Sequence, residues 1–163
     1  MRKDKCFGLW LVTSLVLVAG LSIPAGFADA AAPPSTAGRC APTQGDAGDS
    51  SYKANAPVRS RVGTGFVLNG IVRSSIDCSI ITRARVEFWL AGPNGYDDAH
   101  RGTVITDGNG RYRFESSVPG SVGWRPHIHL RIAVPGFRTL VTVYFPPAGA
   151  AAGTFDLVLE PDV

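Results

Sequence analysis

The sequence contains little cysteine, three residues in 163, and none of them has the CxxC spacing of a zinc or redox site. Beyond residue 21 no apolar run is long enough to span a membrane, and no segment combines helical periodicity with caps. A glycine-rich phosphate loop, a Ser-His-Asp order and internal repeats are also missing. These absences argue against helical bundles, nucleotide-binding domains and triad hydrolases.

The charge balance is modest, with a formal net charge of +3 at pH 7. The basic residues are scattered along the chain and form no stripe with interleaved aromatics, so we expect no nucleic-acid partner.

The N-terminus has the layout of a cleavable export signal, with a basic start at 1–5, an apolar run at 7–21 and small residues around Ala30. We therefore expect residues 1–30 to be a signal peptide and the protein to be secreted, without membrane contact after cleavage. An uncleaved anchor is the alternative, although the run is short and interrupted by Gly, Ser and Thr.

Two cysteines, Cys40 and Cys78, would remain after cleavage, and an even pair in an exported chain predicts one disulfide. On the chain-entropy account such a bridge stabilises the fold by about 3 to 4 kcal/mol. Two free buried thiols are the alternative.

The pattern after the signal predicts an extended arm at 31–62 and an all-β domain at 63–163. The arm is rich in Ala, Pro, Gly, Ser and Asp and lacks apolar periodicity, and Cys40 would pin it to the domain. The domain alternates apolar and polar residues in short segments, separated by turns such as 107–110 (DGNG). This is typical of an antiparallel β-sandwich of about seven to nine short strands. The expected strands are 65–72, 82–90, 103–105, 111–115, 128–134, 140–145 and 154–159.

The most informative motif is 124–129 (WRPHIH), because two of only three histidines, His127 and His129, stand two residues apart. In a β-strand this spacing points both imidazoles to one face, about 7 Å apart along the chain. Tyr96 follows a strand in a loop, and its phenolate together with two imidazoles suits iron(III). Copper or zinc on the histidine pair and two solvated imidazoles without metal are the alternatives.

An ordered set of further motifs surrounds these residues: Gly70, 84–89 (ARVEFW), Gly95-Tyr96, Thr106-Asp107, 110–114 (GRYRF), Pro119-Gly120, 125–129 (RPHIH) and 142–145. The set resembles the intradiol ring-cleavage dioxygenases, which include the catechol 1,2- and protocatechuate 3,4-dioxygenases. The chain looks most like a short, secreted, single-domain branch of that family, without the helical dimerisation segment.

The resemblance implies a β-sandwich with non-haem Fe(III) that cleaves a catechol-type diol with O2 between its two hydroxylated carbons. Tyr96, His127 and His129 match three of the four iron ligands of that family. Arg125 matches the arginine that lies over the substrate ring, and with Trp124 it would bind the substrate. A small aromatic diol and O2 are the implied partners.

Three positions depart from the family pattern. The second tyrosine ligand normally follows the Pro-Gly turn, where this chain has 121–124 (SVGW). Val143 stands in place of a glutamine, and the Arg-Pro-Ala-His-Ile-His motif is one residue shorter. A non-catalytic metal- or aromatic-binding sandwich is therefore the alternative function.

Few residues could replace the missing tyrosine. Tyr112 fits a half-buried strand position, Tyr144 alternates away from position 143, and Tyr52 lies in the arm. His100 is the best spare base or ligand, with a surface-loop histidine as the alternative, and water or hydroxide is the simplest fourth ligand.

Overall fold

The computed structural model describes residues 40–46, 48 and 51–162, which contain eight β-strands and one short 3-10 turn. The expected signal peptide and the start of the arm lie outside these residues. In the described part, no helix is long and apolar enough to cross a membrane. The elements are β1 (Gly65–Ser74), β2 (Arg85–Leu90), η1 (Asp98–His100), β3 (Arg101–Ile105), β4 (Arg111–Ser117), β5 (Ile128–Ala133), β6 (Leu140–Tyr144), β7 (Ala152–Thr154) and β8 (Leu157–Leu159).

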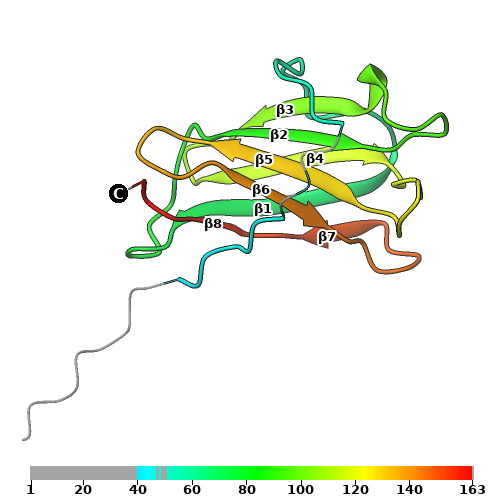
Figure 1. Ribbon diagram of the computed structural model, residues 1–163. Helices are drawn as coiled ribbons and strands as arrows, with labels where there is room; N and C mark the ends of the chain where they lie inside the picture. Colours follow the sequence, from blue (N-terminus) through cyan, green and yellow to red (C-terminus); the bar gives the residue numbers. More distant parts are fainter. Residues whose placement is uncertain (1–39, 47, 49–50, 163) are drawn as a thin grey trace, which may run out of the picture. The chain divides into compact units, whose positions relative to one another are not determined.

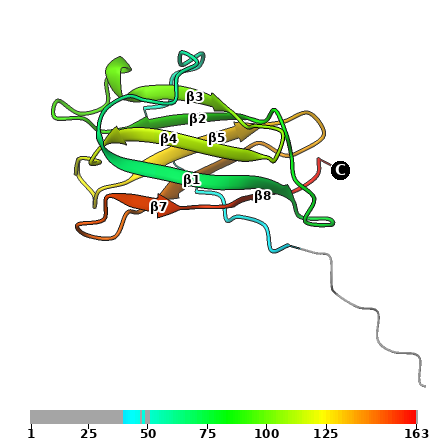
Figure 2. The ribbon, with the colours of Figure 1, turned by 180° about the vertical axis from the view of Figure 1, so that it is seen from behind.

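The strands form two stacked sheets, which Figures 1 and 2 show from opposite sides. One sheet has the order β3-β2-β5-β6 with antiparallel neighbours throughout. In the other, β1 pairs with β4 on one side and with β7 and β8 on the other. The predicted all-β sandwich is confirmed, with a strand number inside the expected range.

The core lies between the two sheets, because strand alternation sends every second apolar side chain inward. On β2 these residues are Val86, Phe88 and Leu90, all at most 1% exposed. The ring of Phe88 stacks on that of Phe114 from the opposite sheet, with centroids 4.2 Å apart and planes inclined by 6°. This stack joins the layer that carries the histidines to the layer behind it.

Where the sequence predicts one last strand at 154–159, the structure has two short strands, β7 at 152–154 and β8 at 157–159, and both run parallel to β1. Between them the backbone leaves the ladder, and the side chain of Asp156 accepts the hydrogen bond of the Ile71 N–H at 3.0 Å. A carboxylate thus takes the place of a backbone carbonyl at the break. The second strand also begins later than expected, because Arg83 has a φ of +56° and interrupts extended structure before Arg85.

The arm is attached to the sandwich at several places. The expected disulfide joins Cys40 to Cys78, with Cα atoms 5.3 Å apart. Farther along, the backbone N–H of Thr43 donates to the carbonyl of Val158, and that of Asp46 donates to the carbonyl of Val141. The described part of the arm therefore contacts both β8 and β6.

The outer face of the β3-β2-β5-β6 sheet carries His129, one of the metal ligands expected from the sequence. Adjacent strands place Arg101, Trp89, His129 and Val143 in register, one from each strand. All four are at most 9% exposed, although they point away from the sandwich core. Other parts of the chain therefore cover this face, and the row includes His129 of the candidate site.

Candidate metal centre

Three side chains converge at one end of β5. The phenol oxygen of Tyr96 lies 2.8 Å from Nε2 of His127 and 3.1 Å from Nε2 of His129. The two Nε2 atoms are 3.0 Å apart. We call these three atoms the tripod, and it unites all three ligands expected from the sequence.

The tripod has the dimensions of one face of a metal coordination shell. Bonds of about 2.1 Å between a metal and its ligands place neighbouring ligand atoms roughly 3 Å apart. Among the described residues, no group of three or more His, Cys, Asp or Glu side chains is placed to hold a metal ion. The tyrosine oxygen is therefore what completes the donor set, and a hard phenolate with two imidazoles fits ferric iron.

His127 is oriented by its own backbone neighbourhood. Its Nδ1 lies 2.7 Å from the carbonyl oxygen of Arg125, which can only accept a hydrogen bond. The hydrogen must then reside on Nδ1, and Nε2 presents a lone pair to the tripod. This is the usual way in which a second partner fixes the tautomer of a metal-binding histidine.

His129 is held by packing. Its ring stacks on Trp89 with centroids 4.9 Å apart and planes inclined by 3°, and its Nδ1 is buried without a hydrogen bond of good geometry in the described structure. Burial first, and the neighbouring His127 second, lower the pKa of His129 to about 4. The charge of Asp46 and a hydrogen bond with the backbone of Gly48 raise this pKa, and so act in the opposite sense. At neutral pH this imidazole is therefore uncharged, as a metal ligand must be.

Tyr96 reaches the tripod from the loop after β2. Gly92 and Gly95 exchange two backbone hydrogen bonds, and Gly95 adopts a φ of +87°, which closes a tight turn just before the tyrosine. Burial raises the pKa of Tyr96, so without a cation the group remains a phenol. A bound cation would reverse this preference, because nearby positive charge favours the phenolate.

Arg125 and Trp124 lie beside the tripod. The guanidinium of Arg125 stacks over the ring of Phe145 at 3.6 Å. Trp124 packs edge-on against Phe145 and contacts the ring of His127, with centroids 4.9 and 5.4 Å apart, respectively. Both residues are exposed, so a planar cation and an indole border the site on its solvent side.

The structure assigns the remaining candidates to other places. The Nδ1 of His100 lies 2.7 Å from the carboxylate of Asp97, and a Cβ at Gly92 would overlap the His100 ring, so this histidine braces the Tyr96 loop. Tyr112 and Tyr144 pack into the core. Residues 121–124 are exposed and contain no phenol.

Tyr52 is the residue that sequence reasoning missed. Its ring packs on Trp89, with centroids 5.4 Å apart, and its hydroxyl donates to Glu87 at 3.0 Å. The available signal was the alternation of 85–89, which places Glu87 and Trp89 on the face opposite the core. A tryptophan on that face requires a cover, and the arm supplies it.

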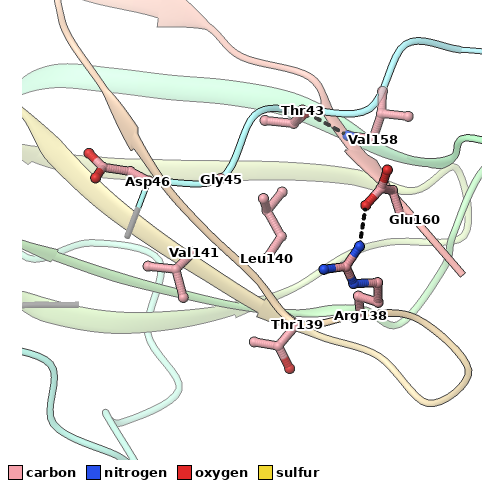
Figure 3. A pocket seen from close by; sticks show the side chains of 9 residues that line it. All are labelled: Thr43, Gly45, Asp46, Arg138, Thr139, Leu140, Val141, Val158 and Glu160. Carbon is pink, nitrogen blue, oxygen red and sulfur yellow. Dashed lines mark hydrogen bonds and ion pairs between the residues drawn. The ribbon is translucent and has the colours of Figure 1, made fainter. Parts of the chain in front are cut away.

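The pocket drawn in Figure 3 lies where the arm meets β6 and β8, and it has a volume of about 530 Å³. The ion pair between Arg138 and Glu160, 3.0 Å long, crosses its lining, and Thr43 is bonded to Val158 beside it. None of the expected site residues lines this pocket. The pocket therefore lies at the contact between the arm and the sandwich.

Comparison with known proteins gives curated relatives that are chlorocatechol 1,2-dioxygenases. No family model matches the chain. A chlorocatechol 1,2-dioxygenase of Pseudomonas putida is 28% identical over 108 residues, covering 49% of this chain and 41% of the relative. A chlorocatechol 1,2-dioxygenase of Burkholderia cepacia is 29% identical over 108 residues, covering 49% and 42%. The chain thus spans less than half the length of the curated relatives it matches.

Solved structures share the fold. The dioxygenase domain of a dioxygenase–carbohydrate-binding fusion protein from Streptomyces sp. SirexAA-E superposes with a TM-score of 0.64 at 23% identity, covering 75% of this chain and all of that domain. Hydroxyquinol 1,2-dioxygenase from Pseudomonas putida DLL-E4 gives 0.60 at 16% identity, covering 79% and 69%. Chlorocatechol 1,2-dioxygenase from Pseudomonas putida gives 0.57 at 22% identity, covering 67% and 68%.

Proposed function

Because the chain is intradiol dioxygenase-like in sequence and fold, we propose that it binds ferric iron at the tripod and cleaves a catechol-type aromatic with O2. The ring opens between the two hydroxylated carbons, and both oxygen atoms enter a dicarboxylate product. The proposal rests chiefly on one observation, the convergence of the Tyr96 oxygen with Nε2 of His127 and of His129 within 3.1 Å.

The chain's own groups have distinct tasks in this reaction. When bound, ferric iron would supply the Lewis acidity that favours the doubly deprotonated diol and its reaction with O2. His127, fixed by the Arg125 carbonyl, and His129, fixed by Trp89, hold their lone pairs in place before any ligand arrives. This preorganisation lowers the cost of assembling the site.

Arg125 provides the positive charge beside the site. Its guanidinium remains protonated at every relevant pH. The stack on the Phe145 ring, at 3.6 Å, holds the guanidinium at the border of the site. In that position it can stabilise negative charge that develops on an aromatic ring, and Trp124 can pack against the ring's edge.

The site has no second tyrosine that could accept the protons of the diol. Residues 121–126 are exposed, so we propose that solvent-derived water or hydroxide accepts these protons. This route keeps turnover possible but removes a positioned base, which typically contributes a factor of about 100 or more.

The experiment is O2 uptake by iron-loaded protein with catechol, protocatechuate or hydroxyquinol. We expect one O2 consumed per diol, and ¹⁸O2 should place two labelled atoms in the dicarboxylate. Resorcinol, whose hydroxyls are not adjacent, serves as the matched negative control. Protein that retains iron and turns over none of the three diols would instead be the non-catalytic metal- or aromatic-binding sandwich, which the missing tyrosine and Val143 favour.

Export is a separate part of the proposal. The 1–30 segment has the layout of a signal peptide, and a disulfide between Cys40 and Cys78 suits an oxidising compartment. We expect mass spectrometry of the protein recovered outside the cell to give a chain that starts near Ala31. Recovery of the intact chain in the cytoplasm would contradict export.

A further inference from the structure

The outer face of the β3-β2-β5-β6 sheet holds a connected set of aromatic and charged side chains behind the tripod. Trp89 lies flat against His129, and Tyr52 from the arm packs on the same indole, with centroids 5.4 Å apart and ring planes inclined by 58°. Trp89 is 1% exposed, even though it points away from the sandwich core. Its burial therefore depends on groups that cover the sheet from outside.

Tyr52 is itself fixed by charge. Its hydroxyl donates to the carboxylate of Glu87, which also pairs with Arg131 at 2.9 Å and with Arg85 at 3.3 Å. Arg131 lies over the Tyr52 ring at 5.1 Å. Glu87 is 4% exposed, and a carboxylate buried this deeply needs its partners, so the hydroxyl has a defined position.

The arm that carries Tyr52 is attached to the sheet on both sides of this residue. Before it, the backbone of Asp46 bonds to Val141 on β6, and after it Val58 forms a parallel bridge with Thr103 on β3. The described parts of the arm thus lie at both edges of the sheet whose outer face carries His129 (Figure 1).

We propose that Tyr52 is a positioning residue for the metal centre: by packing on Trp89 it holds the indole in place beside His129 and so fixes the direction of the His129 Nε2 lone pair. This inference rests on the proposed function only in taking the tripod as a metal site. His127 has a carbonyl partner on Nδ1 at 2.7 Å, whereas in the described structure Nδ1 of His129 has no partner of such good geometry, and only the backbone of Gly48 acts on this ring as a hydrogen-bond partner outside the tripod. Packing from Trp89 and Tyr52 therefore contributes to the orientation of the His129 ring.

The test is the affinity of the full chain for Co²⁺ alone, a metal whose visible bands report its coordination geometry. Loss of a group that orients a metal ligand typically weakens binding 10- to 100-fold. We expect about a tenfold loss and altered bands for Tyr52→Ala. Tyr52→Phe keeps the ring on Trp89 and loses only the bond to Glu87, so we expect a smaller loss. Tyr112→Phe is the matched control, since it also removes one buried phenol hydroxyl, which donates to the Phe155 carbonyl.

The outcomes separate positioning from mere stability. A lower melting temperature in Tyr52→Ala with wild-type Co²⁺ affinity and bands would overturn the inference, because a purely structural arm does not alter the bound metal. Co²⁺ binding that weakens as expected, in a protein that turns over no diol, would uphold the inference and refute the dioxygenase activity. A wild-type protein that binds no Co²⁺ would overturn both.

Discussion

The Nε2 atoms of His127 and His129 lie 3.0 Å apart, with their rings inclined by 74°. Since the Arg125 carbonyl keeps the hydrogen of His127 on Nδ1, its Nε2 can only accept. The hydroxyl oxygen of Tyr96 lies within 3.1 Å of both nitrogens. A single cation between the three atoms would accept one lone pair from each of them, which is the basis of our proposal that this triangle is a metal site.

Arg125 offers a way to separate chemistry from metal binding. We expect Arg125→Gln to retain iron, because the backbone carbonyl that orients His127 is unchanged. The loss of the guanidinium charge should lower kcat/KM about 100-fold, the usual scale for removing one group that stabilises developing negative charge. Steady-state O2 uptake and the iron content of the same preparation measure the two effects. An equal loss of iron would contradict the division of labour.

The disulfide should carry a large part of the stability. Cys40 and Cys78 are 38 residues apart, and closing a loop of this length stabilises a fold by about 3 to 4 kcal/mol. We expect a Cys40→Ser/Cys78→Ser variant to lose that amount in urea unfolding. Reductant should lower the stability of the wild type to the same value and leave the variant unchanged. A wild type that is insensitive to reductant would refute the bridge.

Gly70 should tolerate no side chain. A Cβ at this position in β1 would overlap the carbonyl oxygen of Phe155 and the ring of Tyr112. We expect Gly70→Ala to destabilise the domain by about 1 to 3 kcal/mol, as overpacking does. Gly108→Ala is the control, because a Cβ there has no neighbour within 4 Å among the described residues, and it should stay within about 0.5 kcal/mol. Equal stabilities of the two variants in urea would be inconsistent with the close approach of β1 to the break between β7 and β8.

Asp107 gives a pH-dependent test of the β3–β4 turn. Its carboxylate accepts the backbone N–H groups of Arg111 and Asn109, which lower its pKa. A carboxyl whose folded pKa lies below the unfolded value stabilises the fold above the unfolded pKa, and this contribution disappears as the pH falls through the folded pKa.

We therefore expect the urea midpoint of the wild type to be higher than that of Asp107→Ala, and the difference to be constant between pH 7 and about pH 4.5. The difference should shrink below about pH 4, where the carboxylate of the wild type becomes protonated. A difference that does not change down to pH 2.5 would show that the carboxylate charge is not what holds the turn.

The parts of the fold that the sequence predicts are those governed by local pattern. Alternation from Ala84 to Leu90 identifies the core face of β2, and the HxH spacing places both imidazoles on one face of β5. The parallel pairing of β7 and β8 with β1 was not predictable in this way, because it depends on contacts 85 residues apart such as Ile71 with Asp156. The position of Tyr52 was not predictable either, because it also depends on long-range contacts. The residues around Tyr52 in the sequence show no apolar periodicity, and its contacts are with Trp89 and Glu87 on β2.

The most direct test of the central claim is the visible absorption spectrum of the iron-loaded protein, because a phenolate bound to Fe(III) gives a charge-transfer band that neither imidazole can produce. We predict a coloured protein with one iron per chain, a band that disappears in Tyr96→Phe, and an unchanged band in Tyr112→Phe, whose hydroxyl belongs to the core. A colourless wild type that retains iron, or a band that survives in Tyr96→Phe, would contradict the assignment of Tyr96, His127 and His129 as the iron ligands.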